Sequence, residues 1–317
     1  MVISAIESVL MVFIIVAFGY FIGHKGWANE SVTNFITKLI INITLPCTAV
    51  ASFLSNFSAE TLGSAWILLL AAAGSTLLSY AVCKLVIVLA KIEKSKRGVF
   101  TSLFCYSNSI FIGLPVATAI FGDAGSSYAL LFYIINALFV NSLGYMEISR
   151  DGALLAGHAQ KKEKGGLVKR IFQPPLVAII IAFVLVLLGV KLPDFLMDTL
   201  SYTGGITAPL AIIYVGIILQ RAGLRSLRKI DKDMALVLLG KFIVAPACMF
   251  FVGMLAGLEK FPMQVFIMQM SLPSVTQTAI AAGHFGAHTK FAANGVALTT
   301  LFSFITIPVY AALLYTL

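Results

Sequence analysis

The stretch SNSIFIGLP, residues 107–115, lies in the middle of an otherwise apolar segment. A second stretch of the same kind, SLPSVTQT, occupies residues 271–278. Proline removes an amide donor and clashes with the preceding helical turn, and glycine and serine loosen a helix further. Non-helical backbone is tolerated at membrane depth only where protein or a wet cavity satisfies its polar groups. Two such breaks therefore predict a binding site, with Asn108 and Gln277 as its foremost side chains.

A simple proline kink is the alternative interpretation of any one of these breaks. It is the better interpretation for four prolines in other apolar segments, Pro46, Pro209, Pro246 and Pro308. It explains the two stretches less well, because each also carries polar side chains, which are costly in hydrocarbon unless they are paired.

The composition excludes an ordinary soluble domain. Hydrophobic residues make up 60% of the 317 and charged residues only 11%, whereas soluble domains carry roughly 25% charged residues. Segments of membrane-crossing length recur along the whole chain. The first of them has no basic region ahead of it and carries Glu7, so we expect a retained span and not a cleaved signal. The sequence predicts an all-α membrane protein with a single membrane domain.

Ten transmembrane spans are predicted. They cover residues 3–23, 32–54, 63–90, 98–121, 126–147, 171–190, 195–219, 234–257, 262–286 and 292–316. The odd-numbered loops between them hold 17 lysine and arginine residues, and the even-numbered loops hold 2, Lys191 and Lys260. Because basic residues collect in short cytoplasmic loops, both termini are predicted to be extracytoplasmic in a cell (inner or plasma) membrane.

The net charge of +9 lies mainly in those cytoplasmic loops. There it fits contact with the anionic lipid bilayer. A nucleic-acid partner is not expected, because no basic face interleaved with aromatic residues is present.

The two halves of the chain resemble each other at an offset of 163 to 166 residues. The segment ITLP at 43–46 corresponds to ITAP at 206–209, and Phe121-Gly122 corresponds to Phe285-Gly286. Each half holds five predicted spans, so the second half enters the membrane from the opposite face, as in inverted-repeat transporters. We therefore divide the chain into a first repeat (1–147), a cytoplasmic loop (148–170) and a second repeat (171–317). Chance similarity between apolar segments is the alternative.

The stretch at 107–115 resembles the fourth-helix motif of the auxin efflux carrier family, which includes bacterial malonate and malate permeases. The segment LLGVKLP at 187–193 and the proline-centred ninth span ending in Phe285-Gly286 are similar to that family as well. The resemblance implies a bile acid/sodium symporter-like fold in which broken helices 4 and 9 cross. Spans 1, 2, 6 and 7 would then form a scaffold, and spans 3–5 and 8–10 a transport domain with elevator-like motion in a homodimer. The motif at 273–276 departs more from the family.

The distribution of charge favours an organic anion as the substrate. All acidic residues except Glu7 and Glu147 fall in loops or at their edges, and those two lie near span ends, whereas intramembrane carboxylates mark cation and proton handling. Broken helices offer free amides and the positive ends of helix dipoles. The resemblance suggests a small dicarboxylate such as malate or malonate. Alternatives are a larger aromatic or monocarboxylic acid of auxin type, or a channel or ligand sensor on the same fold.

The candidate site residues lie on both breaks and on three further spans. Those for substrate are Thr44, Pro46, Asn108, Ser109, Gly113, Pro115, Pro273, Ser274, Thr276 and Gln277. Those for ion coupling are Asn136, Asn141, Thr299, Thr300 and His284. The four Asn and Thr side chains either form an ion site from neutral oxygens or satisfy one another inside the bundle. Coupling to H+ or Na+ stays open.

No metal, cofactor or enzymatic activity is expected. His284 and His288 have a metal-ligand spacing but no third ligand beside them. The sequence lacks the G-x-S-x-G, H-E-x-x-H and phosphate-loop motifs. Lys38, Lys84 and Lys241 lie within about two turns of the cytoplasmic edge, where lysine side chains extend to the interface. We therefore predict that these lysines point to the interface. Direct contact with substrate is the alternative, above all for Lys84 and Lys241, which an anion leaving inward could pass.

Overall fold

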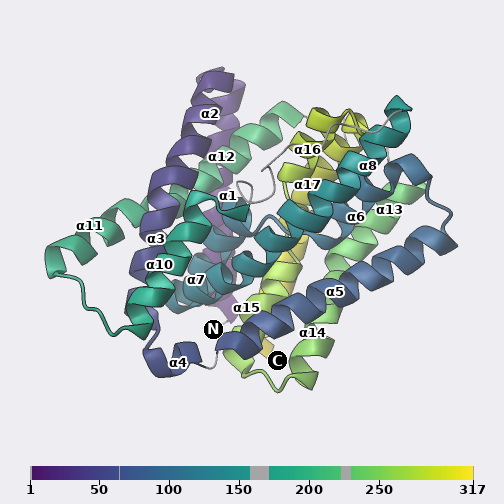
Figure 1. Ribbon diagram of the computed structural model, residues 1–317. Coiled ribbons are helices and arrows are strands. Elements are labelled where there is room, and N and C mark those ends of the chain that lie inside the picture. Colours follow the sequence, from purple (N-terminus) through teal and green to yellow (C-terminus); the bar gives the residue numbers. More distant parts are fainter. Residues whose placement is uncertain (1, 64, 158–170, 223–229, 317) are drawn as a thin grey trace.

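The computed structural model describes residues 2–63, 65–157, 171–222 and 230–316, and almost all of these residues are helical (Figure 1). Within these ranges no β-strand is formed, and an isolated β-bridge joins Ser107 to Ser274. The protein is all-α, as its composition predicts.

The first half of the chain folds into helices, and short π-helical turns join some of them. In chain order the helices are α1 (Val2–His24), α2 (Glu30–Leu39), α3 (Leu45–Asn56), α4 (Ala59–Gly63), α5 (Ala65–Leu89), α6 (Arg97–Cys105), α7 (Leu114–Phe139) and α8 (Tyr145–Ala156). A kink at Gly122, where φ is +71°, divides α7 just after the predicted end of the fourth span.

The second half follows a similar order. Its helices are α10 (Pro174–Leu187), α11 (Asp194–Gly205), α12 (Thr207–Ala222), α13 (Lys232–Leu239), α14 (Ala245–Leu255), α15 (Lys260–Met270), α16 (Gln277–Phe285) and α17 (Thr289–Thr316).

Three helices that carry proline as their second residue follow a π-helical segment. The prolines are Pro46 in α3, Pro115 in α7 and Pro246 in α14. The preceding segments are Ile40–Thr44, Ser109–Gly113 and Gly240–Val244. Since proline supplies no amide to the preceding turn, that turn widens instead of continuing as α-helix.

Both predicted breaks are confirmed. Helix α6 ends at Cys105 and the chain resumes helical geometry at Ser109. Helix α15 ends at Met270 and α16 begins at Gln277.

Six helical stretches among the described residues are long and apolar enough to cross a membrane, judged by length and composition. They are Glu30–Asn56, Ala65–Leu89, Ser109–Ala156, Asp194–Arg221, Lys232–Leu255 and Thr289–Leu314. This supports a multi-pass membrane protein. The number of ten spans stays a prediction, because the stretch Ser109–Ala156 includes parts of two predicted spans and the broken helices yield pieces too short to count.

The helices pack in two groups. In the first, α1 lies against α12, and α3 lies against α10 and α11. In the second, α5 packs on α14, α6 on α8, and α16 on α8 and α17. Figure 1 shows α2, α3, α10 and α11 on the left and α5, α6, α8 and α13 on the right. Contacts of α7 with α1, α3 and α12 join the groups.

Helix α8 continues to Ala156, into the segment predicted as a cytoplasmic loop. The side chain of Asp151 explains this extension, because its carboxylate accepts a hydrogen bond of 2.8 Å from the amide of Val99 at the start of α6. The rest of the predicted loop, 158–170, lies outside the described residues.

Candidate functional site

The two interrupted helices cross as a pair of short antiparallel strands. The amide of Asn108 donates to the carbonyl of Pro273 at 2.9 Å, and the amide of Val275 donates to the carbonyl of Tyr106 at 3.1 Å. Ser107 and Ser274 face each other between these bonds and are fully buried. The crossing that the resemblance implies is thus formed by backbone pairing.

Side chains from α7 and α17 hold the two strands in place. Asn136 accepts a hydrogen bond from the amide of Ser107 at 3.2 Å and donates to the carbonyl of Ser107 at 2.8 Å. The hydroxyl of Thr299 accepts from the amide of Ser274 at 3.1 Å. Asn136 and Thr299 therefore support the crossing, and the ion-binding role predicted for them stays a prediction.

Asn108 organises the start of the π-helical segment that follows it. Its amide group donates to the hydroxyl of Thr276 at 3.1 Å, across the crossing. Its side-chain oxygen accepts from the amide of Phe111 at 3.3 Å, and its carbonyl accepts from the amide of Gly113 at 2.9 Å. Replacement of Asn108 removes both the cross-strand bond and the helix cap.

A cleft opens beside the crossing. Its lining residues are Ile41, Leu45, Ser107, Asn108, Ser109, Ile110, Phe111, Tyr133, Asn136, Ala137, Val140, Gln173, Pro175, Val275, Thr276 and Gln277. We call it the crossing cleft. Every side chain in this set is uncharged, and amides and hydroxyls from both breaks lie in it beside apolar groups. Such a lining suits a small ligand with polar ends.

The N-terminus of helix α16 lies at this cleft. Thr276, at its N-terminus, forms no side-chain cap, and Thr276 and Gln277 both line the cleft. The uncapped first turn of a helix attracts anions.

The expectation of free amides within the breaks is wrong for four residues. The amides of Ser107, Asn108, Ser274 and Val275 all donate to protein groups. Strand pairing supplies acceptors that a broken helix alone would lack.

Lys241 lies at the crossing, although the sequence favours an interface position for it over contact with substrate. Its side chain is fully buried, and its Nζ lies 2.6 Å from Oγ of Ser107. The predicted extension to the membrane interface is therefore wrong for Lys241. Lys38 is exposed, as predicted, and Lys84 is half-buried in an ion pair of 2.6 Å with Glu147.

Gln269 on α15 also lies at the broken helices, and it is not among the candidate residues predicted from the sequence. Its Nε2 donates to the carbonyl of Gly113 at 3.0 Å, and its Oε1 is buried without a hydrogen-bond partner. A Cβ at Gly113 would collide with that oxygen and would lie 2.6 Å from Cδ1 of Leu272. Gly113 is therefore required for close packing between the two broken helices.

The structure places the remaining predicted residues outside the crossing cleft. Pro115 is buried in the first turn of α7, and Pro273 and Ser274 lie in the paired strand. Thr44 and Pro46 are not among the lining residues, whereas Ile41 and Leu45 of the same span are.

Three residues proposed for coupling also lie away from the crossing cleft. Asn141 and Thr300 donate to carbonyls of their own helices, those of Ala137 and Val296, both at 2.8 Å. His284 is exposed near the end of α16.

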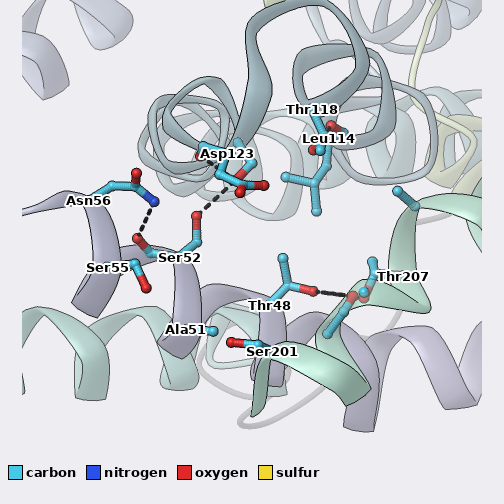
Figure 2. Close-up of a pocket in the computed structure, with 14 residues that line it drawn as sticks. Thr48, Ala51, Ser52, Ser55, Asn56, Leu114, Thr118, Asp123, Ser201 and Thr207 are labelled. Carbon is cyan, nitrogen blue, oxygen red and sulfur yellow. Dashed lines mark hydrogen bonds between the residues drawn. The ribbon is translucent and has the colours of Figure 1, made fainter. Parts of the chain in front are cut away.

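A second cavity lies between α3, α7 and the junction of α11 and α12 (Figure 2). Hydroxyl groups dominate its polar lining, so we call it the hydroxyl-lined cavity. Oγ of Ser52 on α3 lies 2.8 Å from Oγ of Ser126 on α7, which joins the two helix groups. Thr48 and Thr207 form a similar contact of 2.8 Å within the first group.

Comparison with known proteins identifies the family. A family model described as Membrane transport protein matches residues 4–311. An uncharacterized transporter of Methanocaldococcus jannaschii is 25% identical over 97% of this chain and 98% of its own length. One from Methanothermobacter thermautotrophicus is also 25% identical, over the same shares. The uncharacterized transporter YfdV of Escherichia coli K12 is 23% identical over 96% of each chain. The chain belongs to this membrane transport protein family, the auxin-efflux-carrier-like family that its motif at 107–115 resembles.

Proposed function

We propose that this membrane transporter carries a small organic anion, a dicarboxylate such as malonate or malate, by secondary active transport with elevator-like alternating access. Family membership supports membrane transport. The crossing cleft supports the choice of substrate, and the two helix groups support the mechanism.

The observation that carries the anion assignment is the combination of charges around the crossing cleft. The lining includes the side-chain amides of Asn108 and Gln277 and contains no carboxylate. The uncapped end of α16 and the buried ammonium of Lys241 both place positive potential beside it. A cation would meet that potential without any compensating negative charge, whereas a carboxylate is attracted to it and finds donors.

Ten spans in two inverted repeats fit the packing of the helices. Helix α1 packs on α12, which are spans 1 and 7, and α3 packs on α10, which are spans 2 and 6. Spans 1 and 6 are equivalent in the two predicted repeats, and so are spans 2 and 7. Exchange of the two repeats therefore converts the pair 1–7 into the pair 6–2. Such exchange symmetry is expected when two five-span repeats are related by an axis in the membrane plane.

Alternating access fits the positions of the two cavities. On the scaffold side, residues of α3 line both cavities, and residues of the π-helical turn before α3 also line the crossing cleft. On the side of the transport domain, the lining comes from α7 and, for the crossing cleft, from the crossing as well. In the predicted topology Gln173 of the crossing cleft lies on the cytoplasmic side, and Asp123 of the hydroxyl-lined cavity lies on the extracytoplasmic side. Movement of the transport domain past the scaffold would open the crossing to each side in turn.

The direct test is flux in proteoliposomes that contain the purified full chain. Labelled malonate, malate, acetate and indole-3-acetate are offered with and without pH and sodium gradients. We expect saturable uptake of a dicarboxylate with counterflow, and the gradients identify the coupling ion. Preference for indole-3-acetate would support the aromatic-acid alternative. Uptake that does not saturate would indicate a channel, and binding without flux would indicate a sensor. Absence of both binding and flux for every acid would refute the proposal.

A further inference from the structure

Lys241 occupies an unusual position for a lysine in an apolar helix. It belongs to the π-helical segment Gly240–Val244 between α13 and α14. The ring of Phe104 packs directly against Gly240, so no larger residue fits there. This close approach brings the side chain of Lys241 into the interior beside α6, and its Nζ reaches Ser107, 134 residues earlier in the chain.

The ammonium of Lys241 lacks a negative partner among the residues that the structure describes. The ion pairs found there use other cations, such as Lys84 with Glu147 and Lys96 with Asp233. A buried, uncompensated charge is strongly unfavourable unless a counter-charge or hydrogen bonds stabilise it. The hydroxyl group of Ser107 accepts a hydrogen bond from one N–H of the ammonium, but it is neutral and does not balance the positive charge. An anion bound beside Lys241 would supply the missing counter-charge.

Ser107 connects this charge to the crossing cleft. Its hydroxyl oxygen accepts the hydrogen bond from Lys241, and the residue lines the cleft. A hydroxyl that accepts from a cation is polarised, and its own hydrogen remains to be donated. A carboxylate in the cleft can accept that hydrogen, which gives an ammonium–hydroxyl–carboxylate chain.

We propose that Lys241 is the positioning residue that supplies the positive charge for anion binding at the crossing, and that it acts through the hydroxyl of Ser107. This inference rests on the proposed function and adds a specificity rule to it. When Lys241 is protonated its charge is buried, and each negative charge on the ligand gains from it. A dianion should therefore depend on Lys241 more strongly than a monoanion of similar size.

The test measures the Kd of malonate, a dianion, and acetate, a monoanion, for the purified full chain by titration calorimetry. Lys241→Gln keeps a donor for Ser107 and removes the charge. We expect it to raise the Kd of malonate on the order of tenfold or more, and that of acetate clearly less. Ser107→Ala removes the hydroxyl group between Lys241 and the ligand and keeps the charge. It should raise the Kd of malonate less than Lys241→Gln does. Lys38→Gln removes an exposed charge and should leave both values within about twofold.

The readouts distinguish this inference from the proposed function. Equal weakening of malonate and acetate in Lys241→Gln would assign Lys241 a structural role and overturn the inference, while anion binding itself would stand. Wild-type affinities in Lys241→Gln would overturn it as well. If the wild-type chain binds neither malonate nor acetate nor any acid of the flux panel, the proposed function fails and the inference fails with it. Should Lys241→Gln not fold, Lys241→Met, which fills a similar volume without charge, replaces it with the same expectations.

Discussion

Asn136 and Ser107 form a two-point hydrogen bond, in which the amide side chain of Asn136 satisfies both the backbone N–H and the backbone C=O of Ser107. In the second half, Thr299 satisfies the amide of Ser274. Position 299 is 163 residues after position 136, within the offset that relates the two halves of the sequence. Each strand of the crossing is thus supported by a side chain at an equivalent position in its own half.

Asn136→Ala should destabilise the crossing. It leaves the buried N–H of Ser107 unpaired and removes one of the hydrogen bonds to the carbonyl of Ser107, which also accepts from the amide of Ser109; the unpaired N–H costs about 1–3 kcal/mol. The apparent melting temperature in detergent should fall and anion binding should weaken. Asn141→Ala is the matched control, because Asn141 is also buried on this long helical stretch but bonds only to the carbonyl of Ala137 in its own helix. Equal melting temperatures for the two variants would contradict the support role of Asn136.

Gly113→Ala should disrupt the packing of the broken helices. The added methyl group meets Gln269 and Leu272, and overpacking of this kind costs typically about 1–3 kcal/mol. Gly283→Ala in α16 meets no atom within 4 Å and should be neutral or slightly stabilising. Thermal unfolding of both variants checks the expectation, which a stable Gly113→Ala variant would refute.

A disulfide between the two helix groups should stop transport. Ser52→Cys with Ser126→Cys places two thiols where hydroxyl groups now lie 2.8 Å apart, in a background without Cys47, Cys83, Cys105 and Cys248, which are free cysteines. Oxidation should abolish flux, and reduction should restore it, because elevator motion requires the groups to slide.

The control crosslink is Thr48→Cys with Thr207→Cys, which joins two helices of the same group. Oxidation of this pair should leave flux largely unchanged. Full activity of the oxidised Ser52–Ser126 pair would argue against relative motion of the two groups.

The predicted topology is open to a fusion test in a bacterial inner membrane. Alkaline phosphatase fused after Leu317 should be active, because the C-terminus is expected to be extracytoplasmic. The same enzyme fused after Lys94, in a loop expected to be cytoplasmic, should be inactive. The reverse pattern would invert the orientation, and activity in both fusions would refute the alternation of loops.

Sequence reasoning located the breaks because their cause is local. Proline, glycine and serine at 107–115 and 271–278 act on the turn in which they stand, so both interruptions lie in the predicted stretches. Asn108 and Gln277 were recognised by polarity alone, and both line the crossing cleft.

Other features of the site depend on packing between distant segments. Lys241 was expected to extend to the interface because its distance along the helix permits this. Its side chain instead lies in the interior, next to the contact between Gly240 and Phe104. The backbone amides in the crossing pair with a strand that is distant in the sequence. Ser107 and its partner Ser274 are 167 residues apart. No pattern in a single sequence reports either contact.

The central claim, that the crossing cleft binds the transported anion, is tested most directly by saturable uptake of labelled malonate in proteoliposomes of Asn108→Ala. Loss of the bond to Thr276 and of the cap at Phe111 should lower uptake by about tenfold or more at equal protein insertion. Asn34→Ala, at an exposed position of α2, should transport like the wild type. Wild-type uptake by Asn108→Ala, with normal insertion and an unchanged half-saturation concentration, would contradict the claim.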